Sequence, residues 1–315
     1  FILDGGHNPQ CAEAVAGSVK KYFPDKNMTL IIGMLRDKDY VSALDLILAC
    51  ADRCCCLTPA SHRALPGEEL ADIIRKKGIP AESFGSAEEA VQVCLAENRP
   101  VLAFGSLYMA GDVRRAHRKI YKKKLRRAAI AAREALSEED RVKYSKAVCD
   151  KITELPEYKA AGTIFIYKWV KGEVKLDTLE AAAARDGKRL VYPLCITNTD
   201  MIAVEPGPGT DAWKGSGFQG IMEPDPDKGQ VIDPADIDLV VAPCSSFDKA
   251  CRRLGMGGGF YDRYLPKCVN SKVIAVAFET QRSEKIPTDQ YDLPVGTVVT
   301  ESRIYQYLSS TSKSD

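Results

Sequence analysis

The chain has 315 residues, of which 45% are hydrophobic and 28% charged, and its formal net charge is +1. This length and composition predict a globular protein with room for two domains, each burying its own core. The near-zero net charge excludes a large basic surface and no apolar run has membrane-spanning length, so we expect neither nucleic acid nor a membrane as a partner.

The first third alternates short apolar segments with segments of helical periodicity. This pattern predicts a mostly parallel sheet with helices on its faces. The expected strands are residues 1–4, 28–34, 53–59, 81–85 and 101–106. The expected helices between them are residues 9–23, 39–51, 66–78 and 86–98.

The remainder predicts a second α/β unit. Residues 114–152 are almost continuously helical in pattern and basic at their start, with no Gly- or Pro-rich linker between the halves. The composition of the tail, residues 309–315, is typical of disorder. The expected strands of the second unit are residues 162–170, 189–195, 201–206, 238–244 and 273–279.

The eleven cysteines are odd in number and include the adjacent Cys54, Cys55 and Cys56, without C-x-x-C spacing beside histidines. This usage favours reduced thiols in a cytoplasmic protein over a disulfide framework or a zinc site. The chain opens on "FILDGGHNP", a buried-strand pattern without an initiator methionine. We interpret it as a fragment or a processed piece of a longer protein.

A glycine-rich segment, "RLGMGGGFYDRYL", spans residues 253–265. Consecutive glycines leave backbone N–H groups bare, so that they can surround a phosphate. By itself the segment is equally consistent with a tight turn, because it has neither a G-K-[ST] ending nor a G-x-G-x-x-G pattern. Arg252 and Arg253 precede it with charges that suit phosphate oxygens, and Asp262 follows where it could hold magnesium.

A second charged feature lies upstream, where Lys122 and Arg126 stand four residues apart on one helical face and Arg133 follows two turns later. On charge alone, this pattern favours a solvated basic helix face over a phosphate site.

These residues carry a resemblance to the 5-formyltetrahydrofolate cyclo-ligase family. The spacing from Lys122 through Arg126 and Arg133 to Ser137 resembles the opening of that family. The segments "GEV" from Gly172, "GIMEP" from Gly220, "RLGMGGGFYDRYL", "AFETQ" and "YDLPV" follow in the family's order. The resemblance covers about residues 118–305.

The resemblance implies an α/β cyclo-ligase domain over residues 118–315. Its reaction would be the ATP-dependent cyclisation of 5-formyltetrahydrofolate, a reduced folate, to 5,10-methenyltetrahydrofolate, with release of ADP and phosphate. The implied cofactors are ATP and Mg2+, and Asp262 and Asp292 would hold the metal. The residues implied to be catalytic are Lys122, Arg126 and Arg253. The nucleotide would also contact Leu254, Gly255, Met256, Gly257, Gly258, Gly259, Phe260 and Tyr261. The folate would contact Glu173, Phe218, Gln219 and Tyr261.

The sequence departs from the family pattern at four positions, which would alter fine contacts rather than the reaction. Cys251 stands where Gly is usual, Met256 where some members carry a basic residue, and Phe260 where Tyr is usual. Gln219 stands where an aromatic residue is common.

The first third resembles the C-terminal domain of folylpolyglutamate synthase, a Mur ligase relative. The segments "LDGGHNP", "GMLRDKD" and "FGSLYMAG" carry this resemblance over roughly residues 1–115. It implies a Rossmann-like domain over residues 1–117, with Asp4 and His7 facing ATP phosphates. Because the chain contains no G-K-[ST] loop, we expect this ligase part to be incomplete. The alternative to a cyclo-ligase is a non-catalytic nucleotide- or folate-binding module.

Overall fold

A computed structural model of the protein describes residues 1–24, 28–97, 99–170, 172–215, 221–289 and 292–307. The chain divides into two compact units, Phe1–Tyr121 and Lys122–Asp315. Across the described residues, every helix is too short or too polar to cross a membrane.

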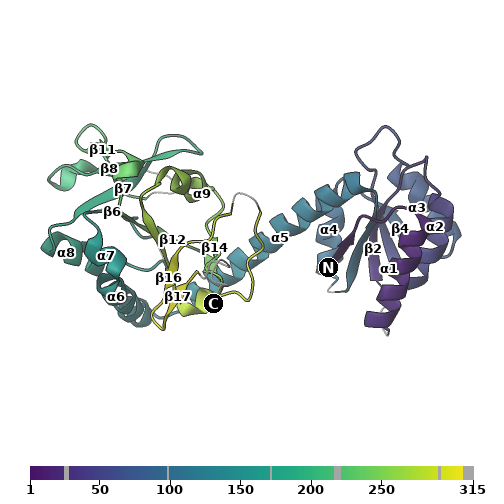
Figure 1. The fold of residues 1–315 in the computed structure, drawn as a ribbon, viewed down its shortest axis with the longest axis horizontal. Helices are drawn as coiled ribbons and strands as arrows, with labels where there is room; N and C mark the ends of the chain where they lie inside the picture. The colour runs from purple at the N-terminus through teal and green to yellow at the C-terminus, as the bar shows by residue number, and fades with distance from the viewer. Residues whose placement is uncertain (25–27, 98, 171, 216–220, 290–291, 308–315) are drawn as a thin grey trace, which may run out of the picture. The chain divides into compact units, whose positions relative to one another are not determined.

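The first unit is a five-stranded parallel sheet covered by helices on both faces (Figure 1). Its strands are β1 (Ile2–Asp4), β2 (Met28–Gly33), β3 (Ala51–Cys56), β4 (Ala81–Ser83) and β5 (Val101–Gly105). Its helices are α1 (Pro9–Tyr22), α2 (Tyr40–Ile47), α3 (Gly67–Lys76) and α4 (Ala87–Ala96). The strand order is β1-β5-β2-β3-β4, as expected for a doubly wound α/β fold.

The cysteine run lies in β3 and contributes to both hydrophobic cores of this unit. Cys54 and Cys56 pack in the core that contains α1, α2 and α3, whereas Cys55 packs in the core that contains α4. The side chains of a strand alternate between the two faces, so a strand covered on both sides is apolar throughout. All eleven cysteines of the chain are free thiols.

The long helix α5 (Leu107–Glu134) begins in the first unit and ends in the second. Its first turns pack Met109, Val113 and Ala116 into the core of the first unit. It stops before Ser137, whose hydroxyl accepts a hydrogen bond from Asp140 N at 3.0 Å and caps α6 (Glu138–Glu154). Residues 114–152 are therefore two helices. The predicted domain division after residue 117 falls inside α5 and stays a prediction.

The second unit is built on an eight-stranded mixed sheet in the order β11-β8-β7-β6-β12-β15-β16-β17. Its strands are β6 (Thr163–Phe165), β7 (Arg189–Cys195), β8 (Met201–Glu205), β11 (Gln230–Ile232), β12 (Leu239–Pro243), β15 (Lys272–Val276), β16 (Thr297–Val299) and β17 (Ile304–Gln306). The five central strands, β7, β6, β12, β15 and β16, are parallel. The edge strands pair antiparallel: β8 with β7 and β11 with β8 at one edge, and β17 with β16 at the other.

Helices cover both faces of this sheet as well (Figure 1). One face packs against α6, α7 (Pro156–Ala160) and α8 (Asp177–Arg185), and the other against α9 (Phe260–Tyr264). Two short ribbons complete the unit: β9 (Trp213–Lys214) pairs with β10 (Glu223–Pro224), and β13 (Ser246–Phe247) pairs with β14 (Arg253–Leu254).

The α/β architecture predicted from the sequence is confirmed, but several boundaries were wrong. The helix expected over residues 39–51 ends at Ile47, because the chain from Ala51 pairs with β2 instead. The strand expected over residues 162–170 is only Thr163–Phe165. The chain beyond it leaves the sheet and lines a pocket.

Candidate active site

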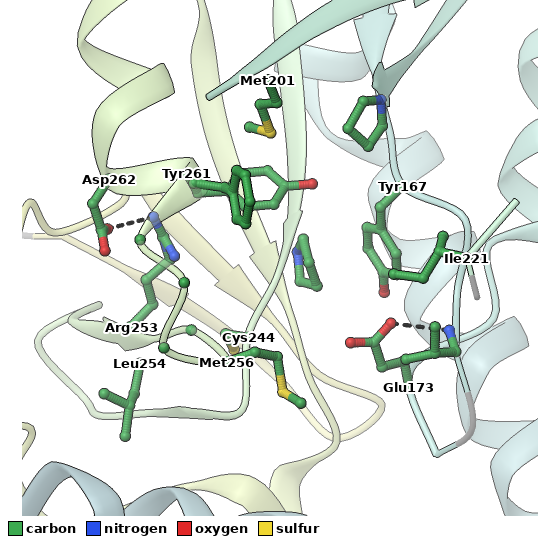
Figure 2. Close-up of a pocket in the computed structure, with 18 of the residues that line it drawn as sticks. Tyr167, Glu173, Met201, Ile221, Cys244, Arg253, Leu254, Met256, Tyr261 and Asp262 are labelled. Atoms are coloured by element: carbon green, nitrogen blue, oxygen red, sulfur yellow. Dashed lines mark hydrogen bonds and ion pairs between the residues drawn. The ribbon is translucent and has the colours of Figure 1, made fainter. Parts of the chain in front are cut away.

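A cavity of about 350 Å³ opens in the second unit, beyond the carboxyl ends of β6 and β12. This is the edge of an α/β sheet at which ligands bind. The glycine-rich loop forms one wall, with Arg253 and Met256, and Tyr167 and Glu173 form the opposite wall (Figure 2). Lys122 and Arg126 of α5 also line it, so the two charged features of the sequence meet here.

The glycine-rich loop has a backbone conformation that its glycines allow and that leaves its N–H groups exposed to the cavity. Gly257 and Gly259 have φ angles of 111° and 70°, a region that residues with a Cβ rarely adopt. The carbonyl of Gly255 accepts a hydrogen bond from Arg126 Nε at 2.7 Å, and that of Gly258 accepts one from Arg263 Nη2 at 2.7 Å. The backbone N–H groups of residues 255–259 donate to no described residue, so they are available to an anion.

Arg253 is the most buried cation of this wall. Its side chain is 2% exposed, and Nη2 donates to Asp262 Oδ1 at 2.7 Å (Figure 2). Its guanidinium lies 5.6 Å from the centre of the Tyr261 ring. Its Nε is buried without a hydrogen-bond partner among the described residues, as is the hydroxyl of Tyr261. A buried donor without a partner is costly, and a bound ligand would satisfy it.

Lys122 and Arg126 are both partly withdrawn from water. Lys122 Nζ lies 2.5 Å from Asp292 Oδ2 and 3.6 Å from Asp289 Oδ2. Burial lowers the pKa of the Arg126 guanidinium from its ordinary value. These contacts exclude the interpretation of a wholly solvated basic face. In this structure Asp292, an expected metal ligand, is an ion-pair partner of Lys122.

The opposite wall contains Glu173, which is 9% exposed. Its Oε2 accepts a hydrogen bond from Val170 N at 3.1 Å, and its Oε1 lies 3.9 Å from Arg133 Nη1. Burial raises the pKa of this carboxyl above its ordinary value. Phe218 and Gln219, the other expected folate contacts, lie outside the described residues.

Leu254, Phe260 and Tyr261 line the same cavity, as the sequence-based set of site residues requires. Met256 lines it as well, and the Ser245 hydroxyl lies 3.1 Å from its sulfur. Sequence reasoning missed Tyr167, Lys168 and Glu223, which line this cavity too. The only signal for Glu223 was its place in the segment "GIMEP".

Asp248 braces the turn that leads into the glycine-rich loop. Its carboxylate is 0% exposed. It accepts hydrogen bonds from the backbone N–H groups of Ala250, Arg252 and Ile286 and from Arg252 Nε, at 2.8–3.2 Å. Within this turn Cys251 has a φ of 56°, a left-handed conformation that favours glycine and strains a residue with a Cβ.

Replacing Asp248 by alanine should lower the free energy of unfolding by about 3 kcal/mol, because buried backbone donors lose their acceptor. Chemical denaturation measures this change. Lys249→Ala removes an exposed side chain of the same turn and should change stability by no more than about 0.5 kcal/mol. Equal stability of the two variants would contradict the bracing role.

In the first unit, Asp4 is the last residue of β1, and His7 lies in the loop between β1 and α1. Asp4 Oδ1 accepts a hydrogen bond from Gly6 N at 2.7 Å, and His7 Nδ1 lies 3.2 Å from Gly5 O. Both contacts are local to the turn, so the phosphate-facing role of these residues stays a prediction. Over the described part of the chain, no group of three or more His, Cys, Asp and Glu residues could hold a metal ion.

Known proteins match both units. The family model described as the 5-formyltetrahydrofolate cyclo-ligase family matches residues 118–301, and that described as Mur ligase, glutamate ligase domain, matches residues 1–107. The 5-formyltetrahydrofolate cyclo-ligase of Escherichia coli strain K12 is 27% identical over 179 residues, which cover 56% of this chain and 97% of that protein.

A solved structure agrees with this match. The 5,10-methenyltetrahydrofolate synthetase of Aquifex aeolicus is 32% identical, with a TM-score of 0.53, over 62% of this chain and 96% of that one. For the first unit, folylpolyglutamate synthase of Lacticaseibacillus casei is 30% identical over 121 residues. That match covers 36% of this chain but only 26% of the relative's length.

Proposed function

Because this chain belongs to the 5-formyltetrahydrofolate cyclo-ligase family through residues 118–301, we propose that it converts 5-formyltetrahydrofolate to 5,10-methenyltetrahydrofolate, consuming ATP and releasing ADP and phosphate. The observation that carries the proposal is the convergence of free loop amides with three cationic side chains, Lys122, Arg126 and Arg253, around one pocket. A buried carboxylate, Glu173, lies on the opposite wall.

The reaction needs a site of this kind because an amide oxygen is a poor leaving group. The formyl oxygen first attacks the terminal phosphorus of ATP, so that an O–P bond forms and ADP departs. The neighbouring amine nitrogen then attacks the formyl carbon and loses its proton. The C–O bond breaks, and phosphate leaves with the bonding electrons. Most of the catalysis is thus positioning and charge neutralisation around the transferred phosphoryl group.

We assign the glycine-rich wall to the phosphates and the Glu173 wall to the folate. The amides of residues 255–259 would donate to phosphate oxygens, as would the guanidinium of Arg253, whose Nε lacks a partner among the described residues. Tyr261 reaches from the phosphate wall with a buried hydroxyl that also lacks a described partner, so it would contact the folate where the two substrates meet.

The residues present fit a magnesium ion, which protein sites hold by one or two carboxylates with substrate phosphates and water completing its shell. Asp262 is the residue best placed to hold it, since its side chain is 34% exposed and borders the loop. Asp292 would join it after releasing Lys122. When bound, the metal would neutralise phosphate charge.

The test follows the near-ultraviolet absorbance of the methenyl product at graded ATP concentrations. Lys122→Ala and Arg126→Ala should each raise the KM for ATP or lower turnover by about tenfold, because each removes a partly buried phosphate contact. Lys143→Ala removes an exposed charge of α6 and should leave the rate unchanged. Equal, small effects at all three positions would contradict the phosphate assignment.

A parent protein that binds ATP or folate without ATP-dependent growth of the product band would be a non-catalytic binding module instead.

For residues 1–107 we propose the remnant or fragment of a folylpolyglutamate synthase. On their own these residues would not join glutamate to folate, because they contribute Asp4 and His7 but no G-K-[ST] loop. The reduced cysteines fit a cytoplasmic setting.

A further inference from the structure

A buried pair of opposite charges lies at the pocket. Only one member of the pair lines the cavity, where a substrate could contact it. Arg133 lies in the last turn of α5, and its side chain is 3% exposed. Its Nη1 lies 3.9 Å from Glu173 Oε1. Glu173 lines the cavity and Arg133 does not. Arg133 therefore lies behind Glu173 as seen from the pocket.

The backbone around Glu173 is shaped to bring these groups together. Gly172 has a φ of 82°, and a Cβ at that position would lie 3.3 Å from Arg133 Nε. A side chain there would be strained and would crowd the guanidinium. The carboxylate is also fixed by the Val170 N–H, and Glu173 N donates to Val170 O at 2.9 Å. One carboxylate oxygen is thus bound to the backbone, and the other faces Arg133.

We propose that Arg133 is a positioning residue, which holds the Glu173 side chain in place and in its carboxylate form for the folate. The proposal rests on the proposed function, because it takes the folate as the ligand of this wall. It assigns Arg133 no contact with substrate. A buried carboxylate without an opposite charge would take up a proton, and it would then present a donor where the substrate needs an acceptor.

Arg133 is the charged side chain that lowers the pKa of Glu173. Burial raises the pKa of Glu173, whereas the Val170 N–H and the Arg133 charge lower it. Among the described residues, Tyr167 after β6, Tyr261 of α9 and Cys244 after β12 also interact with Glu173. Burial raises the pKa of all three, so they stay neutral near neutral pH. Removing Arg133 should therefore raise the pKa of Glu173 further.

The experiment measures kcat/KM for 5-formyltetrahydrofolate from about pH 5 to about pH 9 and follows the acidic limb of the profile, which the raised pKa of Glu173 would set. In Arg133→Met the acidic limb should move up by about one pH unit or more, and the KM for folate at neutral pH should rise about tenfold. The KM for ATP should stay within about twofold. Glu173→Gln should abolish the acidic limb, and Arg133→Met should add little to Glu173→Gln in the double variant.

Arg133→Lys keeps the charge on a different side chain and should restore most of the folate KM and the position of the limb. If Arg133→Met fails to fold, Arg133→Gln takes its place, because it removes the charge but keeps a polar side chain, and it should move the limb in the same direction. Arg75→Met, which breaks an exposed ion pair of α3, is the control and should leave both KM values unchanged.

The outcomes separate the inference from the function on which it rests. If the parent forms no methenyl product, the proposed function fails. If the parent is active and folded Arg133→Met or Arg133→Gln keeps the parental limb and folate KM, the inference is overturned. A loss of stability with unchanged kinetics would also overturn it, because it would make Arg133 a purely structural residue.

Discussion

Gly257→Val should raise the KM for ATP at least about tenfold, with a smaller change in the KM for folate. Gly257 has a φ of 111°, which a β-branched residue adopts only with strain. A Cβ there would also lie 3.6 Å from the Arg126 guanidinium carbon, so the larger side chain would displace a phosphate contact. The loop would relax toward ordinary backbone angles and turn its amides away from the ligand.

Gly187→Val is the matched control for backbone strain. Gly187 has a φ of 67° and lies just after α8, and a Cβ at that position would meet no other group within 4 Å. The variant should lose stability comparably while keeping the parental KM for ATP. Gly258 differs from both, because its φ is ordinary and its Cβ would meet the Phe260 ring at 2.9 Å. Parental ATP kinetics in Gly257→Val would make the glycine-rich loop a turn without a role in binding.

Arg253→Met should lower kcat/KM by about a hundredfold or more, because it removes a buried donor aimed at charge that develops during phosphoryl transfer. It would also leave the Asp262 carboxylate without the partner that Arg253 provides at 2.7 Å. Steady-state kinetics with both substrates measure this loss. Arg36→Met removes an exposed arginine from an ion pair with Glu69 in the first unit and should have no effect.

Asp262→Asn tests whether the negative charge of Asp262 binds magnesium, because the substitution removes that charge without changing the size of the side chain. The substitution keeps the volume but replaces the carboxylate that magnesium would use by a neutral amide, whose oxygen is a weaker ligand, so added magnesium should recover part of the lost rate. It should recover none in Arg253→Met. A rate of Asp262→Asn that is independent of magnesium would exclude Asp262 as the metal ligand.

The sequence predicts the architecture well where one physical signal dominates. Cys54, Cys55 and Cys56 lie in a short apolar run, and a strand covered on both faces must be apolar throughout. The glycines among residues 255–259 indicated a backbone that must stay free of side chains or adopt positive φ angles, and two of them do have positive φ. Local composition was sufficient for both predictions.

The prediction fails where contacts distant in sequence decide the structure. The segment after β6 reads as a continued strand, yet it leaves the sheet to place Glu173 in the pocket. The contact between Arg133 and Glu173 joins residues on α5 and on a distant loop, and no periodicity reveals it. Asp248 is completely buried and accepts a hydrogen bond from the backbone of Ile286, a contact distant in sequence that no local pattern reveals.

The shared helix α5 determines where the protein can be divided. Met109, Val113 and Ala116 are covered by the sheet of the first unit. A shortened protein that began at residue 107 would carry these three apolar side chains into water as an exposed stripe on a free helix end, which favours aggregation. One that began just before Lys122 would keep both pocket cations of α5 and leave the stripe behind. The cleanest place for a protease site or an engineered start is therefore the turn of helix between Ala116 and Lys122.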